Sequence, residues 1–145
     1  MAPASARSIL IIESDPDRGQ TLATTLAPMA SAPVIAISTH DQALDVLRRQ
    51  PHPQDCPNLI LLSLNPADDG QISILEAIKS DSRLKRIPVI LLAASEVPSD
   101  ILRCYELQGN CYIIRPASAA RLTKTIEQIE SFWLNTVTLP EVANR

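Results

Sequence analysis

Five short apolar runs, each followed by a stretch with helical spacing, constrain this sequence more than any other feature. The runs are Ser8–Ile12, Val34–Ser38, Leu59–Leu62, Val89–Leu92 and Cys111–Ile114. They are continuously apolar rather than alternating, which is typical of strands that are buried on both faces of a parallel sheet. Strands that alternate with helices predict an α/β domain. We therefore expect a five-stranded parallel sheet, doubly wound by five helices.

The segments between the runs carry helix signals. Asp15 is suited to cap a first helix that begins at Pro16 and places Leu22 and Leu26 four residues apart. The last helix is predicted from one apolar stripe, formed by Leu122, Ile126, Ile129 and Trp133. We expect that stripe to cover the sheet.

Length and composition limit the remaining possibilities. The chain has 145 residues, 46% of them hydrophobic, which suits one domain. A net charge of -3 argues against nucleic acid as the main partner, and the longest apolar run, Val89–Ala94, is too short for a membrane span. Three cysteines without paired spacing favour reduced thiols and a cytoplasmic protein. With three glycines, the chain has no glycine-rich phosphate loop, and we expect no cofactor.

In a parallel sheet, ligand chemistry collects beyond the carboxyl ends of the strands. The segments at these ends resemble the receiver domains of response regulators: Ile9–Glu13, Leu59–Asn65, Pro88–Leu92 and Tyr112–Pro116. A closer likeness, to the single-domain regulators that partner cyanobacterial phytochromes, rests on Ile101–Leu107, Asn110–Ile113 and Phe132–Pro140. The resemblance implies a flavodoxin-like receiver domain over residues 8–132. It leaves a disordered lead-in at 1–7 and a C-terminal extension at 133–145.

The resemblance also implies a phosphorylation site, and this sequence departs from it. The family carries an acidic pair after the first strand, an acceptor aspartate after the third, a Thr or Ser after the fourth and a Lys after the fifth. The matching positions here are Glu13-Ser14, Ser63, Ala93 and Arg115. Mg²⁺ prefers several oxygen ligands that carry charge, so we expect it to bind weakly or not at all.

The residues at these positions suggest a structural role. Ser63 has a neutral hydroxyl that would need a base to attack phosphate, and Glu13 is the only candidate nearby. We expect Arg115 to pair with Glu13 in place of a metal site; the alternative is that Arg115 binds an anion or a partner's carboxylate. The neighbouring acids Asp15, Asp68 and Asp69 are interpreted as cap and turn residues, although Asp15 also fits a displaced member of the acidic pair.

The function predicted from these features is that of a pseudo-receiver. It would act as an interaction module of two-component signalling, without phosphorylation and without enzymatic activity. Its partners would be a second copy of the chain and a histidine kinase, a phytochrome-like photoreceptor or another signalling protein. The alternative is a phosphorelay acceptor that uses Asp68 or Asp69. A hydrolase would need a nucleophile, a base and an orienting group together, and the sequence shows no such set.

A homodimer interface is predicted near the fifth strand and the tail. Apolar residues continue past the point where a minimal receiver stops, and exposed apolar patches usually mark contact surfaces. Tyr112 matches the position where receivers carry a rotating aromatic, and we interpret it as an interface residue. The predicted interface set is Tyr105, Tyr112, Trp133, Leu134, Val137 and Leu139. The alternative is that the tail folds back on its own domain.

Overall fold

The computed structural model describes residues 8–30, 32–49 and 56–140. The strands are β1 (Ile9–Ile12), β2 (Val34–Ile37), β3 (Leu59–Ser63), β4 (Val89–Ala93) and β5 (Cys111–Ile114). The α-helices are α1 (Pro16–Ala30), α2 (His40–Arg49), α3 (Asp69–Ser80), α4 (Pro98–Glu106) and α5 (Ala119–Ile129). A 3₁₀ turn, η2 (Leu84–Arg86), precedes β4, and a π-helical segment, η3 (Glu130–Thr136), follows α5.

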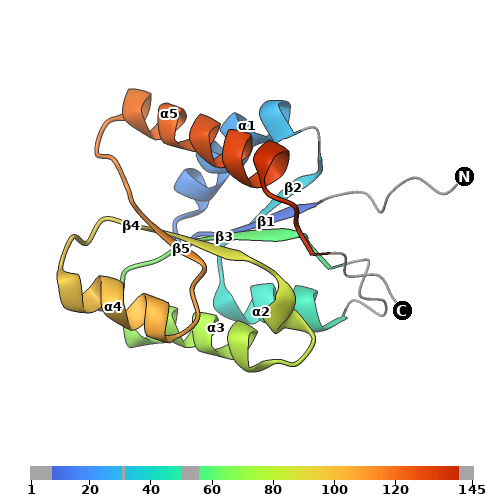
Figure 1. Ribbon diagram of the computed structural model, residues 1–145, viewed down its shortest axis with the longest axis vertical. Helices are drawn as coiled ribbons and strands as arrows, with labels where there is room; N and C mark the ends of the chain where they lie inside the picture. Colours follow the sequence, from blue (N-terminus) through green and yellow to red (C-terminus); the bar gives the residue numbers. More distant parts are fainter. Residues whose placement is uncertain (1–7, 31, 50–55, 141–145) are drawn as a thin grey trace, which may run out of the picture.

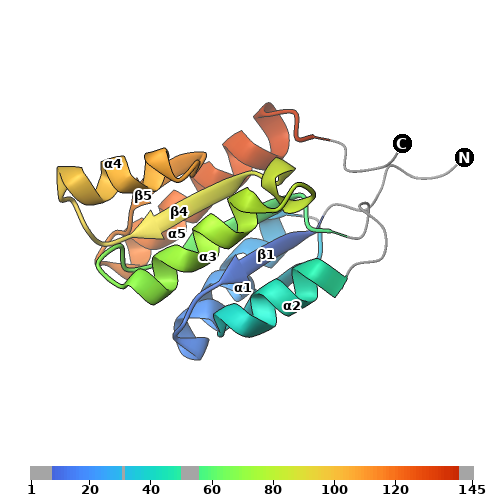
Figure 2. The ribbon, with the colours of Figure 1, turned by 90° about the horizontal axis from the view of Figure 1, so that it is seen from below.

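The strands form one parallel sheet in the order β2-β1-β3-β4-β5, which confirms the predicted architecture. Helices α1 and α5 cover one face, and α2, α3 and α4 cover the other (Figure 1). The view from below shows these last three helices lying side by side in front of the sheet (Figure 2). Every residue of β1, β3 and β4 is buried, because these strands have helices on both faces.

Helix α4 departs from the pattern expected of a core helix. Its apolar residues Leu102 and Tyr105 have exposed fractions of 58% and 48%, whereas Cys104 is fully buried. The apolar residues of α4 therefore do not all lie on the face that contacts the sheet. Apolar side chains of this helix are instead presented on the molecular surface.

The chain continues beyond α5 and returns to its own core. Leu134 and Leu139 are buried in the cluster formed with α1, α5 and the sheet, and Trp133 and Val137 pack against it. The tail thus follows the alternative in which it folds back on its own domain. The predicted lead-in, 1–7, and the last part of the extension, 141–145, lie outside the described residues, and the division at 132/133 stays a prediction. No helix in the part of the chain that the structure describes is long and apolar enough to cross a membrane.

Lys79 joins three elements at the amino ends of the strands. Its Nζ donates to the carbonyl oxygens of Lys85 (3.2 Å) and Ile87 (2.9 Å) and to Oδ1 of Asn110 (2.9 Å). Asn110 Oδ1 also accepts from the N–H of Val89, at the start of β4. Burial lowers the pKa of Lys79 from its ordinary value. One ammonium group therefore links α3, the turn η2 and the approach to β5.

Replacing Lys79 with methionine should weaken the fold. The change keeps the apolar stem but leaves two carbonyl oxygens without their donor, which costs about 1–2 kcal/mol in free energy of unfolding. The control is Lys124→Met, at an exposed position of α5, which should stay within about 0.5 kcal/mol of the parent. Urea unfolding measures both; equal free energies of unfolding for the two variants would contradict a structural role for Lys79.

Candidate functional site

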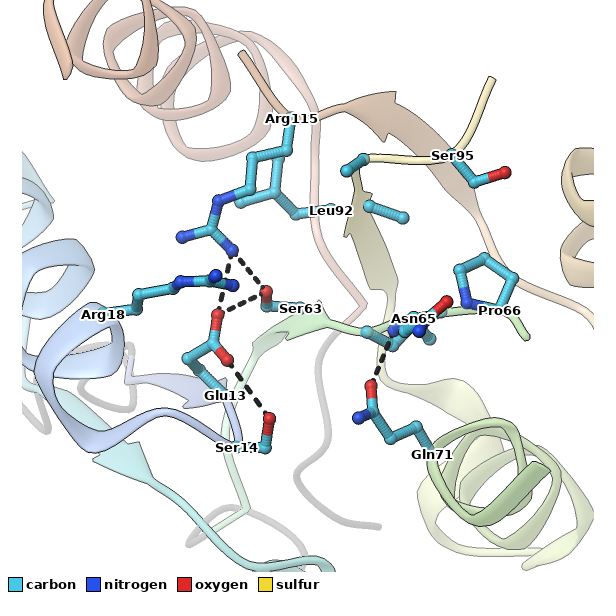
Figure 3. Close-up of a pocket in the computed structure, with 13 residues that line it drawn as sticks. Glu13, Ser14, Arg18, Ser63, Asn65, Pro66, Gln71, Leu92, Ser95 and Arg115 are labelled. Carbon is cyan, nitrogen blue, oxygen red and sulfur yellow. Dashed lines mark hydrogen bonds and ion pairs between the residues drawn. The ribbon is translucent and has the colours of Figure 1, made fainter. Parts of the chain in front are cut away.

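The strand register brings four predicted site positions to one edge of the sheet. Ile12 pairs with Leu62 in the neighbouring strand, and Ser63 pairs with Leu92. Residues that directly follow or end these strands therefore lie close together. The register places Glu13, Ser63, Ala93 and Arg115 around one depression at the carboxyl edge. Figure 3 shows the side chains of Glu13, Ser63 and Arg115 converging there.

The centre of this depression is a three-residue cluster. Arg115 Nη1 donates to Glu13 Oε1 and to Ser63 Oγ, at 2.9 Å in both cases, and Ser63 Oγ donates to Glu13 Oε1 at 2.6 Å. The side chains of Glu13 and Arg115 have exposed fractions of 4% and 14%. The predicted pairing of Glu13 with Arg115 is therefore present, as a buried ion pair that also engages the hydroxyl of Ser63.

The environment of Glu13 favours its ionised form. Burial raises the pKa of this carboxyl, but the N–H of Asp15, the hydroxyl of Ser63 and the guanidinium of Arg115 together hold the pKa below its ordinary value. A carboxylate with a lowered pKa is a weak base. The stability that it contributes is complete above the pKa of an unfolded glutamate and is lost as the pH falls through the lowered folded value.

A cavity of about 460 Å³ lies over the cluster. Sequence reasoning included Ser95 among the strand-end residues but missed two polar residues that line the cavity, Arg18 and Gln71. Gln71 Oε1 accepts from the N–H of Asn65 at 2.6 Å and so occupies a backbone donor at the mouth. The spacing of Gln71 three residues after the capping Asp68 is a helix-start signal that would have located it.

The other predicted positions have simpler roles. Ser14 is exposed, and its hydroxyl lies 3.5 Å from Glu13 Oε2. Ala93 is buried and brings no hydroxyl to the cavity. Asp15 and Asp68 accept from backbone N–H groups at the starts of α1 and α3, which confirms them as caps. Asp69 is exposed and forms an ion pair with Arg103 of α4 at 3.2 Å.

Tyr112 fixes the loop that joins β4 to α4. Its hydroxyl donates to the carbonyl oxygen of Ser95 at 2.8 Å, and its N–H donates to the hydroxyl of Tyr105 at 3.1 Å. The hydroxyl of Ser95 donates in turn to Asp100 at 2.7 Å and accepts from the N–H of Val97. Burial, partly offset by the hydrogen bond to Ser95, raises the pKa of Tyr112. The loop is thus held by the chain's own side chains.

An apolar surface is formed at the β5 edge by exposed residues of α4 and β5, which lie near this loop, and of η3, which lies at the opposite end of the strands. Its exposed members are Val97, Leu102, Tyr105, Ile114 and Phe132. A cavity of about 270 Å³ adjoins it, lined by Cys111, Ile113 and Phe132 among others. Of the predicted interface set, Tyr105 is exposed and Tyr112, Trp133 and Val137 are partly exposed, whereas Leu134 and Leu139 lie in the core.

Among the described residues, no group of three or more His, Cys, Asp or Glu side chains is placed to hold a metal ion. The three cysteines are free thiols.

The Glu13–Arg115 ion pair should contribute to the free energy of unfolding. Arg115→Ala leaves the carboxylate of Glu13 buried without its cation, which should cost about 3 kcal/mol. Ser63→Ala removes one hydrogen bond and should cost at most about 1 kcal/mol. The double variant Glu13→Gln with Arg115→Met should lose less than the sum of its single variants, because no charge remains buried. Urea unfolding at pH 7 measures these five variants; additive losses in the double variant would rule out the pairing as a source of stability.

Several known proteins of similar sequence are response regulators. No family model matches the sequence. The response regulator Rcp1 of Synechocystis sp. is 49% identical over 85 residues, which are 58% of this chain and 57% of Rcp1. The polar-differentiation response regulator DivK of Brucella ovis is 30% identical over 123 residues, 83% of this chain and 94% of DivK. The matched region spans only 47% to 60% of the length of several curated relatives, Rcp1 among them.

Solved structures agree over nearly the whole chain. The Mn²⁺-bound form of Rcp1 has a TM-score of 0.79 at 36% identity, covering 92% of this chain and 99% of that one. The phosphorylated cyanobacterial phytochrome response regulator RcpA has a TM-score of 0.80 at 36% identity, covering 93% and 99%. Together with the parallel sheet and its strand order, these similarities show that the chain belongs to the receiver-domain response regulators of two-component signalling.

Proposed function

We propose that this receiver is a pseudo-receiver: a signalling protein that binds partners without accepting a phosphoryl group, and that acts as a homodimer. The observation that carries the proposal is the cluster of Glu13, Ser63 and Arg115. A receiver transfers phosphate to an ionised carboxylate, and the residue at the end of β3 is a serine. The groups around it are already bonded to one another.

The hydroxyl of Ser63 is poorly suited to attack phosphate. It needs to lose a proton, and Glu13, to which it donates, has a lowered pKa. Arg115 also donates to the oxygen of Ser63 and withdraws electron density from it. Both effects reduce the nucleophilicity of the hydroxyl. These contacts support a structural role for Ser63.

The divalent cation that the family implies does not fit these residues. Glu13 is the one carboxylate among the residues that line the cavity, and both of its oxygens accept hydrogen bonds from within the chain. A cation at this carboxylate would lie against the guanidinium of Arg115. Rcp1 has been solved with Mn²⁺ and RcpA in a phosphorylated form. We propose that this chain replaces the metal with Arg115.

The alternative acceptors, Asp68 and Asp69, are less favoured by their contacts. Asp68 caps α3 and accepts three hydrogen bonds, from two backbone N–H groups and from Gln71 Nε2. Asp69 pairs with Arg103 on the protein surface. Neither carboxylate is among the residues that line the cavity with Arg115. They remain a second candidate for phosphorylation and form the comparison in the mass measurement below.

The proposed dimer uses the apolar surface of α4, β5 and η3. A two-fold contact places one surface against its own copy. The helices beside this surface carry both signs of charge, with Arg103 and Glu106 on α4 and Lys124 and Glu127 on α5. A surface of mixed sign is able to pair with itself without net repulsion. The bonds from Tyr112 hold the β4–α4 loop at its border in a single arrangement.

The further partners are proposed from the relatives. RcpA is a cyanobacterial phytochrome response regulator. A histidine kinase, a phytochrome-like photoreceptor or another signalling protein of the same pathway is therefore the proposed partner, in the cytoplasm. The described structure offers such a partner an apolar surface rather than a basic one.

Acetyl phosphate with Mg²⁺ should leave the mass of the protein unchanged. The reason is the absence of a free carboxylate and of a metal site in the pocket. Intact-mass spectrometry after incubation makes the measurement. The control is Ser63→Asp combined with Arg115→Lys, which restores an acidic acceptor and a compact cation at the two strand ends. A stoichiometric gain of phosphoryl mass in the parent chain, at Ser63, Asp68 or Asp69, would refute the proposal.

Light scattering should find a dimer of about 32 kDa, twice the chain mass of 15.8 kDa. Leu102→Glu and Ile114→Glu place charges in the proposed interface at exposed positions and should give monomers. The matched control is Ile35→Glu, at a similarly exposed position on the opposite edge strand β2, which should remain dimeric. A parent chain that is monomeric at tens of micromolar, or three variants with equal masses, would exclude this interface.

A further inference from the structure

Two arginine side chains line the cavity above the Glu13–Ser63–Arg115 cluster. Arg115 enters from the carboxyl end of β5, and Arg18 enters from the first turns of α1. Figure 3 shows both guanidinium groups on the same side of the site, near the carboxylate of Glu13. Like charges that share one cavity repel each other, and an anion between them relieves that repulsion.

In this site, both oxygens of the carboxylate already accept hydrogen bonds, whereas some guanidinium N–H donors have no acceptor among the described residues. Glu13 accepts from Ser63 and Arg115 at Oε1, and from Asp15 and Ser14 at Oε2. Arg115 makes both of its contacts through Nη1, so that Nε and Nη2 have no acceptor among the described residues. Among the described residues, the guanidinium group of Arg18 has one ion-pair contact, between its Nε and Asp15 Oδ2 at 3.7 Å. The unsatisfied charged groups of the cavity are therefore guanidinium N–H groups.

We propose that this cavity reversibly binds a small oxyanion, a phosphate or a carboxylate, between Arg18 and Arg115. The inference rests on the proposed function, since it requires a site that neither a metal ion nor a phosphorylated side chain occupies. A guanidinium group presents N–H groups in a fixed fork that matches two oxygens of such an anion. The cavity volume of about 460 Å³ leaves room for the anion and several waters. No bond to the anion is made or broken.

The surrounding charges set the expected affinity. Glu13 already offsets Arg115, and Asp15 at the rim partly offsets Arg18. Charge-assisted hydrogen bonds at a site open to water then correspond to a dissociation constant on the order of 1 mM. An anion that binds with this affinity would link Arg18 of α1 to Arg115 at the end of β5. The linked fraction of molecules would rise with the anion concentration. The pocket would thereby respond to a soluble anion by occupancy instead of by group transfer.

The test is a titration of the full-length chain with inorganic phosphate, and in a second arm with acetate, at constant ionic strength. Nuclear magnetic resonance of the arginine Nε–H groups and the backbone amides reports the site. Saturable shifts at Arg18 and Arg115 are expected for one anion or both, and the tighter of the two identifies the class of ligand. Arg18→Gln should weaken binding by about tenfold, whereas Arg121→Gln, an exposed arginine of α5 outside the cavity, should bind as the parent does.

Shifts that rise linearly to about 50 mM of both anions, or equal binding by the parent and Arg18→Gln, would overturn the inference. Because Arg18 is exposed on helix α1, its replacement does not put the fold at risk. Intact mass of the same samples separates the two ideas. A phosphoryl group gained from acetyl phosphate would end the proposed function, whereas unsaturable binding of both phosphate and acetate with unchanged mass would end the anion site alone.

Discussion

A carboxylate at the end of a buried central strand is stable only if a cation balances its charge. The arrangement of polar residues at the carboxyl edge of this sheet depends on that cation. Glu13 follows β1, which lies between β2 and β3, and its side chain is almost wholly excluded from water. The cation comes from Arg115, 102 residues further along the chain. This pair bonds the hydroxyl of Ser63, lines one side of the cavity and connects the end of β1 to the end of β5 at the carboxyl edge of the sheet.

The polar edge and the apolar surface are built from separate contacts. Glu13, Ser63 and Arg115 bond to one another, whereas Tyr112 bonds to Ser95 and Tyr105. At position 93, between the two groups, alanine supplies no hydroxyl to join them. The two sets meet at the cavity wall, because Ser95, which accepts from Tyr112, lines the same cavity as Glu13 and Arg115.

The sequence predicted the sheet and the pocket well for a physical reason. Continuous apolar runs have few alternatives to buried parallel strands, and parallel strands bring the residues at their carboxyl ends together. The resemblance to receiver domains then pointed to Glu13 and Arg115 as the pair expected at that edge. The surface was harder to predict. Apolar spacing on α4 does not reveal which side faces the sheet, and Leu134 and Leu139 were assigned to an interface although they complete the core. Arg18 was missed because the direction of an exposed side chain leaves no periodic signal.

The hydrogen bond from Tyr112 to Tyr105 has a consequence for how other chains approach β5. This strand is an edge of the sheet, and an edge offers unpaired backbone groups on which a foreign strand is able to add. The N–H of Tyr112, in the middle of the short strand, is already taken by a phenol from the adjacent helix. Strand addition would first have to displace that ring. A companion protein therefore meets side chains here, and the free molecule is protected against edge-to-edge aggregation.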